Sequence, residues 1–455
     1  MTRAEIESLL LRNTALIPFK KIIGLEIIQS CSSCRKSLSK ELMVMMMLRI
    51  SLMVMVLYIC YPSFLLSATL DEAVEYTLRQ NPDLRSLRLE EDVAKAQLQK
   101  ARLPLIANPS LETGVVAKGK GGDVQRTFID YGLGLSQEFE IAGQRGFRID
   151  VAEKEIQRVG LEIRDRERLI ASEVRSAFVK ALAFKRRVEL GRETVRLKEE
   201  LLEFTRIKLR AGDVSGLEVN VAELELARSR TEFLAAEREY KESILTLQDI
   251  MGAKPDIYFE IEGELLIDIP VTPDKEDLKK TALANRPDLK SSAVEAERTR
   301  SAIDLTKREA FPNVTVSAFY ERDELRNTGG LRFSVPLPLI DRKQAEKKIA
   351  IIRSQQTAIR YPNLQRMIER EVEEGYLSLI SSRQEIAVYN KEMLGKSLEN
   401  LDLLNLAFRE GKIGFYDVRQ AQKDALDIQF AYVDALLRAQ LAVNALKKIT
   451  GGDLK

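Results

Sequence analysis

The chain has 455 residues, of which 31% are charged and only 6% are aromatic, and its formal net charge is +2. It contains no His and no Trp, so the commonest general base is missing from the sequence. The near balance of charge removes the main electrostatic argument for a nucleic-acid partner, and the composition favours long helices over an ordinary globular core.

Residues 1–68 differ in kind from the rest of the chain. Arg49 precedes an apolar run that ends at Leu66; it has the length of a secretory signal core and is short for a membrane-spanning helix. We predict export with removal of this leader, with Met43 as an alternative start and Cys60 as a candidate lipid acceptor. Removal would leave 63 Lys and Arg against 65 Asp and Glu and no cysteine, so neither disulfides nor thiolate metal sites would remain.

The rest of the chain contains the same series of signals twice, in residues 69–252 and 274–452. The tetrapeptide 81–84, Asn-Pro-Asp-Leu, returns at 286–289 as Arg-Pro-Asp-Leu. The tripeptide 210–212, Arg-Ala-Gly, returns at 409–411 as Arg-Glu-Gly. Such spacing indicates a duplicated structural unit. Residues 253–273 form the linker between the copies, with one isolated strand expected at 257–263.

Each copy opens with a helix, at residues 71–103 and 274–310, which a proline interrupts early. Because the residue before proline avoids helical geometry and proline suits the first turn of a helix, we expect a short helix followed by a longer one. A β-hairpin should follow at 109–139 and again at 312–338, with polar, glycine-bearing loops at 118–123 and 327–330.

The predicted strands alternate between apolar residues and polar or small ones. A half-exposed sheet on a soluble domain would show this pattern, and so would transmembrane barrel strands with a wet interior. In a barrel, the lipid-facing residues would be Ile129, Tyr131, Leu133, Leu135, Val314, Val316, Leu331, Phe333 and Val335.

A helix of unusual length follows each hairpin, at residues 144–210 and 341–409. Its apolar residues recur in sevens, which indicates coiled-coil packing, and Tyr361-Pro362 predicts a kink or break in the second copy. Glycine-bearing turns at 211–216 and 410–414 lead into return helices that end at Gly252 and Gly451. Because an opening helix and a return helix together match one long helix, we expect the two to stack end to end along it.

This order of parts resembles the TolC family of outer-membrane efflux channels. Residues 69–84 are similar to the family's opening motif. Residues 139–145, Phe-Glu-Ile-Ala-Gly-Gln-Arg, resemble the strand-to-helix junction of the cobalt-zinc-cadmium branch, where Gly-Lys-Arg is common and Gln144 here replaces the lysine. The resemblance covers nearly all of residues 69–452, and the duplicated order of the motifs carries it.

The resemblance implies a mainly α fold with a small β part, built by a homotrimer. Four strands per chain would make a twelve-stranded barrel in outer-membrane lipid, and the helices would form a coiled-coil tube through the periplasm. Independently, four strands cannot close a barrel, and open sheet edges are not tolerated in lipid. The implied partners are a periplasmic adaptor (membrane fusion) protein and an inner-membrane pump of the resistance-nodulation-division type.

The resemblance also assigns roles at the two turns. Asp417, and by repeat symmetry Glu218, would form the aperture gate, although an acid at this position also caps the return helix. The residues that would dock the adaptor are Arg210, Gly212, Val214, Gly216, Arg409, Gly411, Ile413 and Gly414.

No catalytic, cofactor or metal site is predicted, so the chain is expected to be a passive exit duct rather than an enzyme. Heavy-metal cations are one candidate cargo, and drug efflux and type I protein secretion stay open. Two alternatives from other classes are a soluble coiled-coil scaffold and an inner-membrane-anchored adaptor. The first leaves the leader and the strands unexplained, and the second has one helical hairpin where this sequence has two.

Overall fold

The computed structural model describes residues 66–119, 127–253, 259–265, 274–323, 326–389 and 391–452. All of the predicted leader except its last three residues, and with it Cys60, lies outside these residues, and the cleavage stays a prediction. The chain divides into two compact units, Met1–Leu66 and Ser67–Lys455, and the architecture below is that of the second unit.

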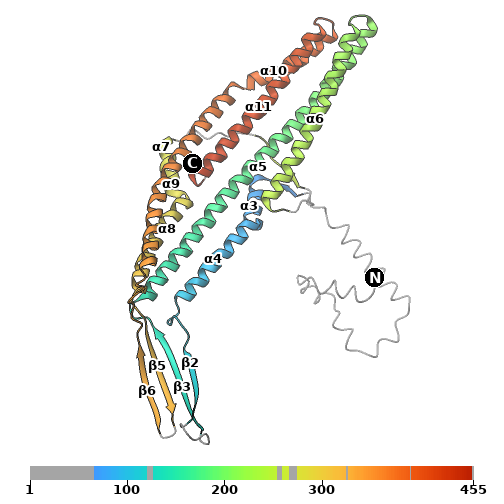
Figure 1. Ribbon diagram of the computed structural model, residues 1–455. Helices are drawn as coiled ribbons and strands as arrows, with labels where there is room; N and C mark the ends of the chain where they lie inside the picture. Colours follow the sequence, from blue (N-terminus) through green and yellow to red (C-terminus); the bar gives the residue numbers. More distant parts are fainter. Residues whose placement is uncertain are drawn as a thin grey trace, which may run out of the picture. The chain divides into compact units, whose positions relative to one another are not determined.

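The second unit is mainly helical with a small sheet, as predicted (Figure 1). The first described elements of the chain are β1 (Leu66–Ala68), which begins at the boundary between the units, α3 (Leu70–Gln80), α4 (Pro82–Ala101), β2 (Ser110–Gly119), β3 (Thr127–Phe139), α5 (Gln144–Ala211), α6 (Gly216–Met251) and β4 (Phe259–Ile261). The elements that follow are α7 (Lys275–Asn285), α8 (Pro287–Glu309), β5 (Val314–Arg322), β6 (Asn327–Ser334), α9 (Gln344–Val388), α10 (Lys391–Arg409) and α11 (Phe415–Thr450).

The opening helices break at the prolines. Asn81 lies between α3 and α4, and its side-chain oxygen accepts hydrogen bonds from the backbone N–H groups of Asp83 (2.9 Å) and Leu84 (3.2 Å). Pro82 takes the first position of α4, where the missing N–H would have had no helical partner. Pro287 takes the same position in α8.

The return helices end against these breaks. The side-chain amide of Asn81 donates a hydrogen bond to the carbonyl oxygen of Ile250 in α6 (3.0 Å), and Gly252 lies beside it. At the end of α11, Gly451 lies against Arg286 in the same way. Helices α4 and α6, of 20 and 36 residues, thus meet end to end along the 68-residue α5, and the 11-residue α3 packs against α5 and α6 beside this joint (Figure 1).

The second long helix departs from the prediction. It divides into α9 and α10 at Tyr389, and Pro362 lies inside α9. Pro362 has no N–H to donate to the carbonyl of Ala358, one turn earlier in the helix. Both residues are exposed, so water can replace the missing hydrogen bond. At the observed break, the N–H of Tyr389 bonds to the Ile386 carbonyl (2.9 Å), and its ring packs against Tyr432 of α11 with centroids 6.0 Å apart.

The second hairpin turns earlier than predicted. Residues 327–330, expected to be its loop, are the first residues of β6, and Val335 lies one residue past the end of that strand. The backbones of Asp323 and Arg326 close the turn instead, through hydrogen bonds of 3.0 and 3.4 Å. A Cβ on Gly330 would lie 3.0 Å from the ring of Phe319. The ring therefore explains this glycine better than a turn does.

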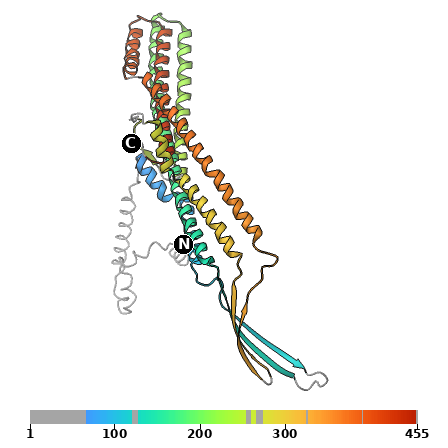
Figure 2. The ribbon, with the colours of Figure 1, turned by 90° about the vertical axis from the view of Figure 1, so that its left-hand side faces the viewer.

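Four strands form one antiparallel sheet in the order β2-β3-β5-β6. Leu133 of β3 lies opposite Thr113 of β2 on one side and Tyr320 of β5 on the other. Within the residues described, β2 and β6 are the edges of this sheet. The sheet extends from the helices at the ends of α4, α5, α8 and α9 (Figures 1 and 2).

Among the described residues, the three largest clusters of buried apolar side chains lie between the helices. One surrounds Phe178 between α3, α5 and α6 and includes Ile261 of β4, whose carbonyl accepts a hydrogen bond from Lys185 of α5 (3.1 Å). Another surrounds Ile368 and Leu446 between α7, α9 and α11. The third joins the two helical hairpins near their turns. Among the described helices, none is both long enough and apolar enough to cross a membrane.

Candidate functional site

The two predicted tip turns lie at the ends of the two long helical hairpins (Figure 1). Gly212 (φ 82°) and Gly411 (φ 73°) end α5 and α10 in the left-handed conformation that favours glycine. Val214 and Ile413 are half-buried. The other predicted docking residues are exposed: Arg210, Gly212, Gly216, Arg409, Gly411 and Gly414.

The two hairpin tips pack on each other. Phe408 and Phe415 of the second hairpin are buried in a cluster with leucines of the first. The guanidinium of Arg409 lies 4.1 Å from the ring centroid of Phe204 and 3.7 Å from the carboxylate of Glu200, both on α5. Arg409, predicted to meet an adaptor, is therefore already held by the first hairpin of the same chain.

The two predicted gate acids fold back onto the starts of their own helices. Glu218 accepts hydrogen bonds from the backbone N–H (2.6 Å) and the hydroxyl (3.1 Å) of Ser215. Asp417 accepts one from the N–H of Gly414 (3.2 Å). Each carboxylate thus lies near the positive end of its helix dipole. The geometry agrees with a capping role, and a ring of Asp417 carboxylates, which needs further copies of the chain, stays a prediction.

A polar layer with a buried lysine joins the two hairpins further along α5. The ammonium of Lys198 lies 3.5 Å from the carboxylate of Glu225 in α6 and 3.4 Å from the side-chain oxygen of Gln422 in α11. Gln422 in turn donates to Asn405 of α10 (2.9 Å). Burial lowers the pKa of Lys198. The sequence signal for this layer is a lysine between the buried Leu197 and Leu201 of α5, which the expectations above do not include.

The sheet carries one apolar and one polar face. The strand register places eight of the nine predicted lipid-facing residues on the same face, and Val335 follows in phase just beyond β6. Leu133 (51% exposed) and Phe333 (68% exposed) are typical of that face. The opposite face is mostly small or polar. It includes Gly132, Gly134, Ser136, Thr315, Ser317 and Glu321.

Gln144 joins the sheet to the long helix. It is 2% exposed, and its side-chain oxygen accepts a hydrogen bond from the N–H of Ala142 (2.9 Å). Its amide nitrogen donates to Asn313 (3.2 Å), which in turn donates to Glu138 (2.7 Å). Because Asn313 belongs to the second half of the chain, this chain of hydrogen bonds links the two halves where strands become helices.

The second half repeats this junction. Gln344 is the first residue of α9, and its side-chain oxygen accepts a hydrogen bond from the N–H of Arg342 (2.7 Å). Lys343 before it has φ 58°, as Gly143 has φ 73° before Gln144. The recurrence of glutamine 200 residues later is the sequence signal that would have marked Gln144 as a structural residue rather than only a departure from the family pattern.

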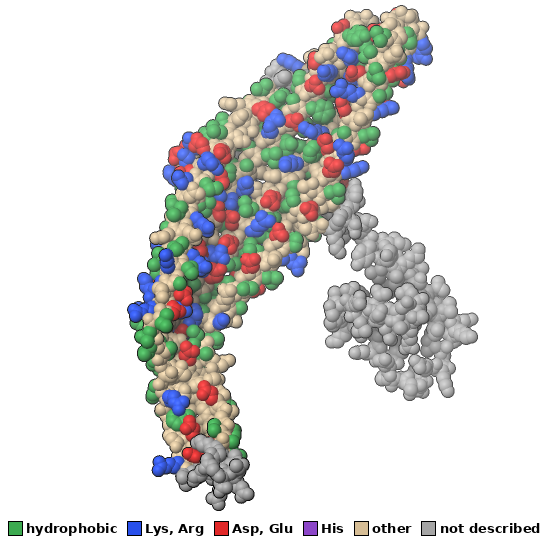
Figure 3. Space-filling model, viewed as in Figure 1, with side chains coloured by type: hydrophobic (Ala, Val, Ile, Leu, Met, Phe, Trp, Pro, Cys, Tyr) green, Lys and Arg blue, Asp and Glu red, His purple; other side chains and the backbone are tan. Residues whose placement is uncertain are grey.

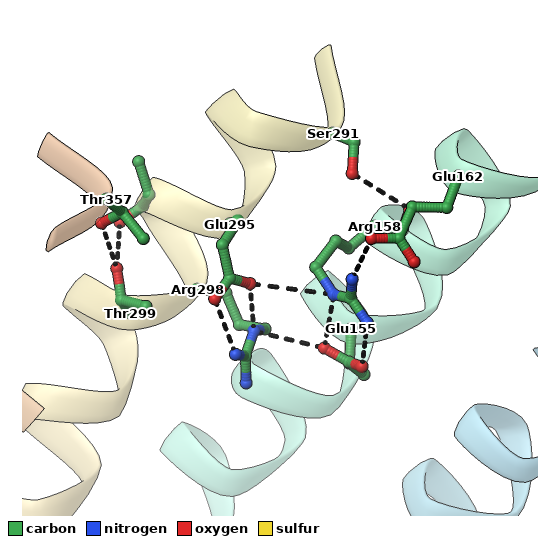
Figure 4. Close-up of polar contacts among 9 residues, drawn as sticks. Glu155, Arg158, Glu162, Ser291, Glu295, Arg298, Thr299 and Thr357 are labelled. Carbon is green, nitrogen blue, oxygen red and sulfur yellow. Dashed lines mark hydrogen bonds and ion pairs between the residues drawn. The ribbon is translucent and has the colours of Figure 1, made fainter. Parts of the chain in front are cut away.

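A layer of alternating charges lies between α5 and α8 (Figure 4). Arg158 binds Glu155 (2.7 Å) and reaches Glu295 (3.7 Å), while Arg298 binds Glu295 (2.7 Å) and reaches Glu155 (3.2 Å). Each carboxylate therefore contacts both guanidinium groups. Hydrogen bonding to Arg158 lowers the pKa of Glu155, whereas burial raises the pKa of Glu162, which also contacts Arg158.

The described residues contain no group of three or more His, Cys, Asp or Glu side chains placed to hold one metal ion. The polar clusters above are instead ion pairs and hydrogen-bonded layers between helices. The candidate functional features are therefore surfaces: a sheet with one apolar and one polar face, and a pair of exposed helical tips.

Comparison with known proteins places the chain among efflux components. The family model described as outer membrane efflux protein matches residues 73–253 and 278–452. The cobalt-zinc-cadmium resistance protein CzcC of Cupriavidus metallidurans is 23% identical over 84% of this chain and 90% of its own. The probable outer membrane lipoprotein SilC of Salmonella typhimurium is 21% identical over 86% and 87%. A membrane protein of Pseudomonas aeruginosa has a similar fold, with a TM-score of 0.72 and 19% identity over 86% of this chain and 92% of that one.

Proposed function

Because this chain belongs to the outer membrane efflux protein family and is thus an outer-membrane efflux channel that extends into the periplasm, we propose that it works as a homotrimer with divalent heavy-metal cations as cargo. The observation that supports this choice of cargo is the similarity to CzcC over most of both chains. Efflux channels of this kind work with an adaptor and an inner-membrane pump.

The sheet supports the trimer. It has an apolar face, a polar face and two open edges, β2 and β6. In lipid, each unpaired backbone group on those edges would cost several kcal/mol, and closing the sheet into a barrel would give these groups hydrogen-bond partners. Three copies that pair β6 of one chain with β2 of the next give a closed barrel, with Leu133 and Phe333 toward lipid and Gly132 and Glu321 toward a wet interior.

The tips support docking of a periplasmic adaptor protein. The first turn presents the exposed Arg210 beside Gly212, whereas Arg409 of the second turn is occupied by Phe204 and Glu200. We assign the direct contact mainly to the first turn and a supporting role to the second. The sequence has no phosphate-binding glycine loop, so energy would come from a partner, for which a resistance-nodulation-division pump is the candidate.

Deletion of this gene in the bacterium that carries it tests the cargo. Tolerance to Co²⁺, Zn²⁺ and Cd²⁺ should fall, and accumulation of these ions should rise, while tolerance to hydrophobic antibiotics should not change. The wild-type gene should restore tolerance. If the deletion strain kept normal metal tolerance but lost drug tolerance or protein secretion, the cargo would be drugs or secreted proteins and not metal cations. A heat-sensitive trimer in the outer-membrane fraction should accompany the protein in either case.

A further inference from the structure

The apolar face of the sheet continues past the last strand. Val335 and Leu337 follow Phe333 at two-residue intervals, with Pro336 between them. The chain then turns at Pro338, where the N–H of Leu339 donates a hydrogen bond to the carbonyl of Leu337 (2.8 Å). Leu337 and Leu339 are 73% and 74% exposed, and Ile340 is 92% exposed. A monomeric soluble protein rarely exposes so many large apolar side chains in a row, so the segment has a partner.

Exposed apolar residues from other strands lie at the same end of the sheet. Ile141 follows Phe139 at the end of β3, and Phe311 precedes β5. We call this set the junction collar. Its members are Phe139, Ile141, Phe311, Val335, Leu337, Leu339 and Ile340.

Cations lie directly beside the junction collar, at the start of α9. Arg342 donates a hydrogen bond from its Nε to the carbonyl of Pro338 (3.3 Å), and Lys348 lies on the exposed surface of the helix. No carboxylate of the described residues lies within 4.0 Å of the charged nitrogens of Arg342 or Lys348. Figure 3 shows Lys and Arg side chains next to hydrophobic ones where α9 meets the sheet.

We propose that the junction collar, together with Arg342 and Lys348, binds the anionic phospholipid surface of the membrane leaflet that faces the helices. This inference rests on the proposed placement of the sheet in the membrane. Apolar side chains at that level can enter the boundary between headgroups and acyl chains, and long cationic side chains can reach the phosphates.

A bilayer fits this surface better than a second copy of the chain does. Copies of the sheet would meet along the strand edges, through backbone groups of β2 and β6. Val335 and Leu337 instead continue the two-residue spacing of Leu331 and Phe333, which lie on the face of the sheet. Positive charge next to this apolar run matches anionic headgroups.

The complete absence of Trp from the chain makes a clean optical test possible. Single-tryptophan variants Leu339→Trp, Leu133→Trp and Leu224→Trp can be reconstituted as trimers in nanodiscs with phospholipids brominated near the headgroup or deep in the acyl chain. Leu224 is exposed on α6, far along the chain from the sheet, and serves as the control. Leu339→Trp should be quenched by headgroup-side bromine, Leu133→Trp by deep bromine, and Leu224→Trp by neither.

The outcomes separate this proposal from the function on which it rests. Quenching at Leu133→Trp without quenching at Leu339→Trp leaves the channel intact and overturns the lipid surface; a blue-shifted but unquenched Leu339→Trp would then identify a protein partner. If neither variant is quenched, the membrane placement of the sheet itself is wrong.

The charge component has its own measurement. In phosphatidylethanolamine nanodiscs with a minority of brominated phosphatidylglycerol, Leu339→Trp should be quenched more than in the same nanodiscs with brominated phosphatidylethanolamine. Adding Arg342→Ala and Lys348→Ala should reduce this enrichment by about fivefold per cation. Lys280→Ala, an exposed lysine on α7, is the control and should leave it unchanged. Equal enrichment in all variants would remove the anionic preference.

Discussion

Gly252 lies against Pro82 so closely that a Cβ on the glycine would be 2.9 Å from the proline Cδ. The two residues belong to different helices: Gly252 ends α6, and Pro82 begins α4. They form the joint at which the helices stacked along α5 meet. A glycine that the sequence marks only as a helix stop therefore also has to be small.

Replacement of Gly252 by alanine should destabilise the chain more than the same change at another helix end. Gly252 has φ 67°, so alanine adds strain and also clashes with Pro82, and we expect a loss of about 2–4 kcal/mol. Gly212 is the matched control: its φ is 82°, but nothing lies within 4 Å of an added Cβ, so Gly212→Ala should cost only about 1–2 kcal/mol. Thermal loss of the helical circular dichroism signal measures both. Equal losses would mean that the joint is not packed as described.

Much of the fold follows from local chemistry that the sequence displays. Pro82 and Pro287 can begin a helix but not continue one, and Gly212 and Gly411 accept the left-handed conformation that ends one. Alternation of apolar and polar residues located the strands. These signals depend on a few neighbouring residues, which is why they could be read without any knowledge of the tertiary structure.

The failures come from contacts between distant residues. Pro362 indicated a kink or a break, but the helix does not break there, because its exposed position lets water replace the lost hydrogen bond. The helix ends instead where Tyr389 meets Tyr432. Gly330 indicated a loop, although the ring of Phe319 across the strand accounts for it. The layer around Lys198 shows the same limit, because its partners lie on three other helices.

Gln144 should tolerate loss of its polar groups poorly. In Gln144→Leu, the half-buried N–H of Ala142 and side chain of Asn313 each lose a hydrogen-bond partner, which we expect to cost about 1–3 kcal/mol and to reduce assembly. The repeat supplies the control, since Gln344 makes the equivalent bond to Arg342 but is exposed, and water can replace it. Melting temperatures of both variants decide. A larger loss for Gln344→Leu would reverse the assignment.

The two faces of the sheet should differ sharply in their tolerance of charge. Arginine at Leu133 would place a cation toward lipid and should cost about 2–4 kcal/mol near the membrane midplane. Arginine at Gly132, the adjacent residue on the other face, would lie beside the side chain of Glu321. The yield of heat-sensitive trimer in the outer membrane should fall much further for Leu133→Arg. Similar yields would show that the apolar face does not contact lipid.

The charged layer of Figure 4 should give stability a specific pH dependence. Because Arg158 lowers the pKa of Glu155 below its ordinary 4.5, this carboxylate stabilises the fold above pH 4.5, and its contribution is lost as the pH falls through the lowered value. Glu155→Gln should therefore cost about 1–3 kcal/mol at neutral pH, and the gap to wild type should close in acid. Glu193→Gln, in an exposed pair with Arg196, should show little change at any pH. A gap that stayed constant into acid would assign the loss to packing.

Asp417 allows a test of the gate against the helix cap. Its carboxylate accepts the N–H of Gly414 (3.2 Å), and an asparagine oxygen can accept the same bond, so Asp417→Asn should preserve the fold. If three copies bring the carboxylates to roughly 6 Å from one another, their repulsion of about 3 kcal/mol per pair at an effective dielectric near 20 would favour a bound cation. Asp417→Asn trimers in planar bilayers should then lose cation selectivity and block by multivalent cations, whereas Asp213→Asn, in the other turn, should keep both. Unchanged selectivity in a stable Asp417→Asn trimer would leave the carboxylate with the capping role alone.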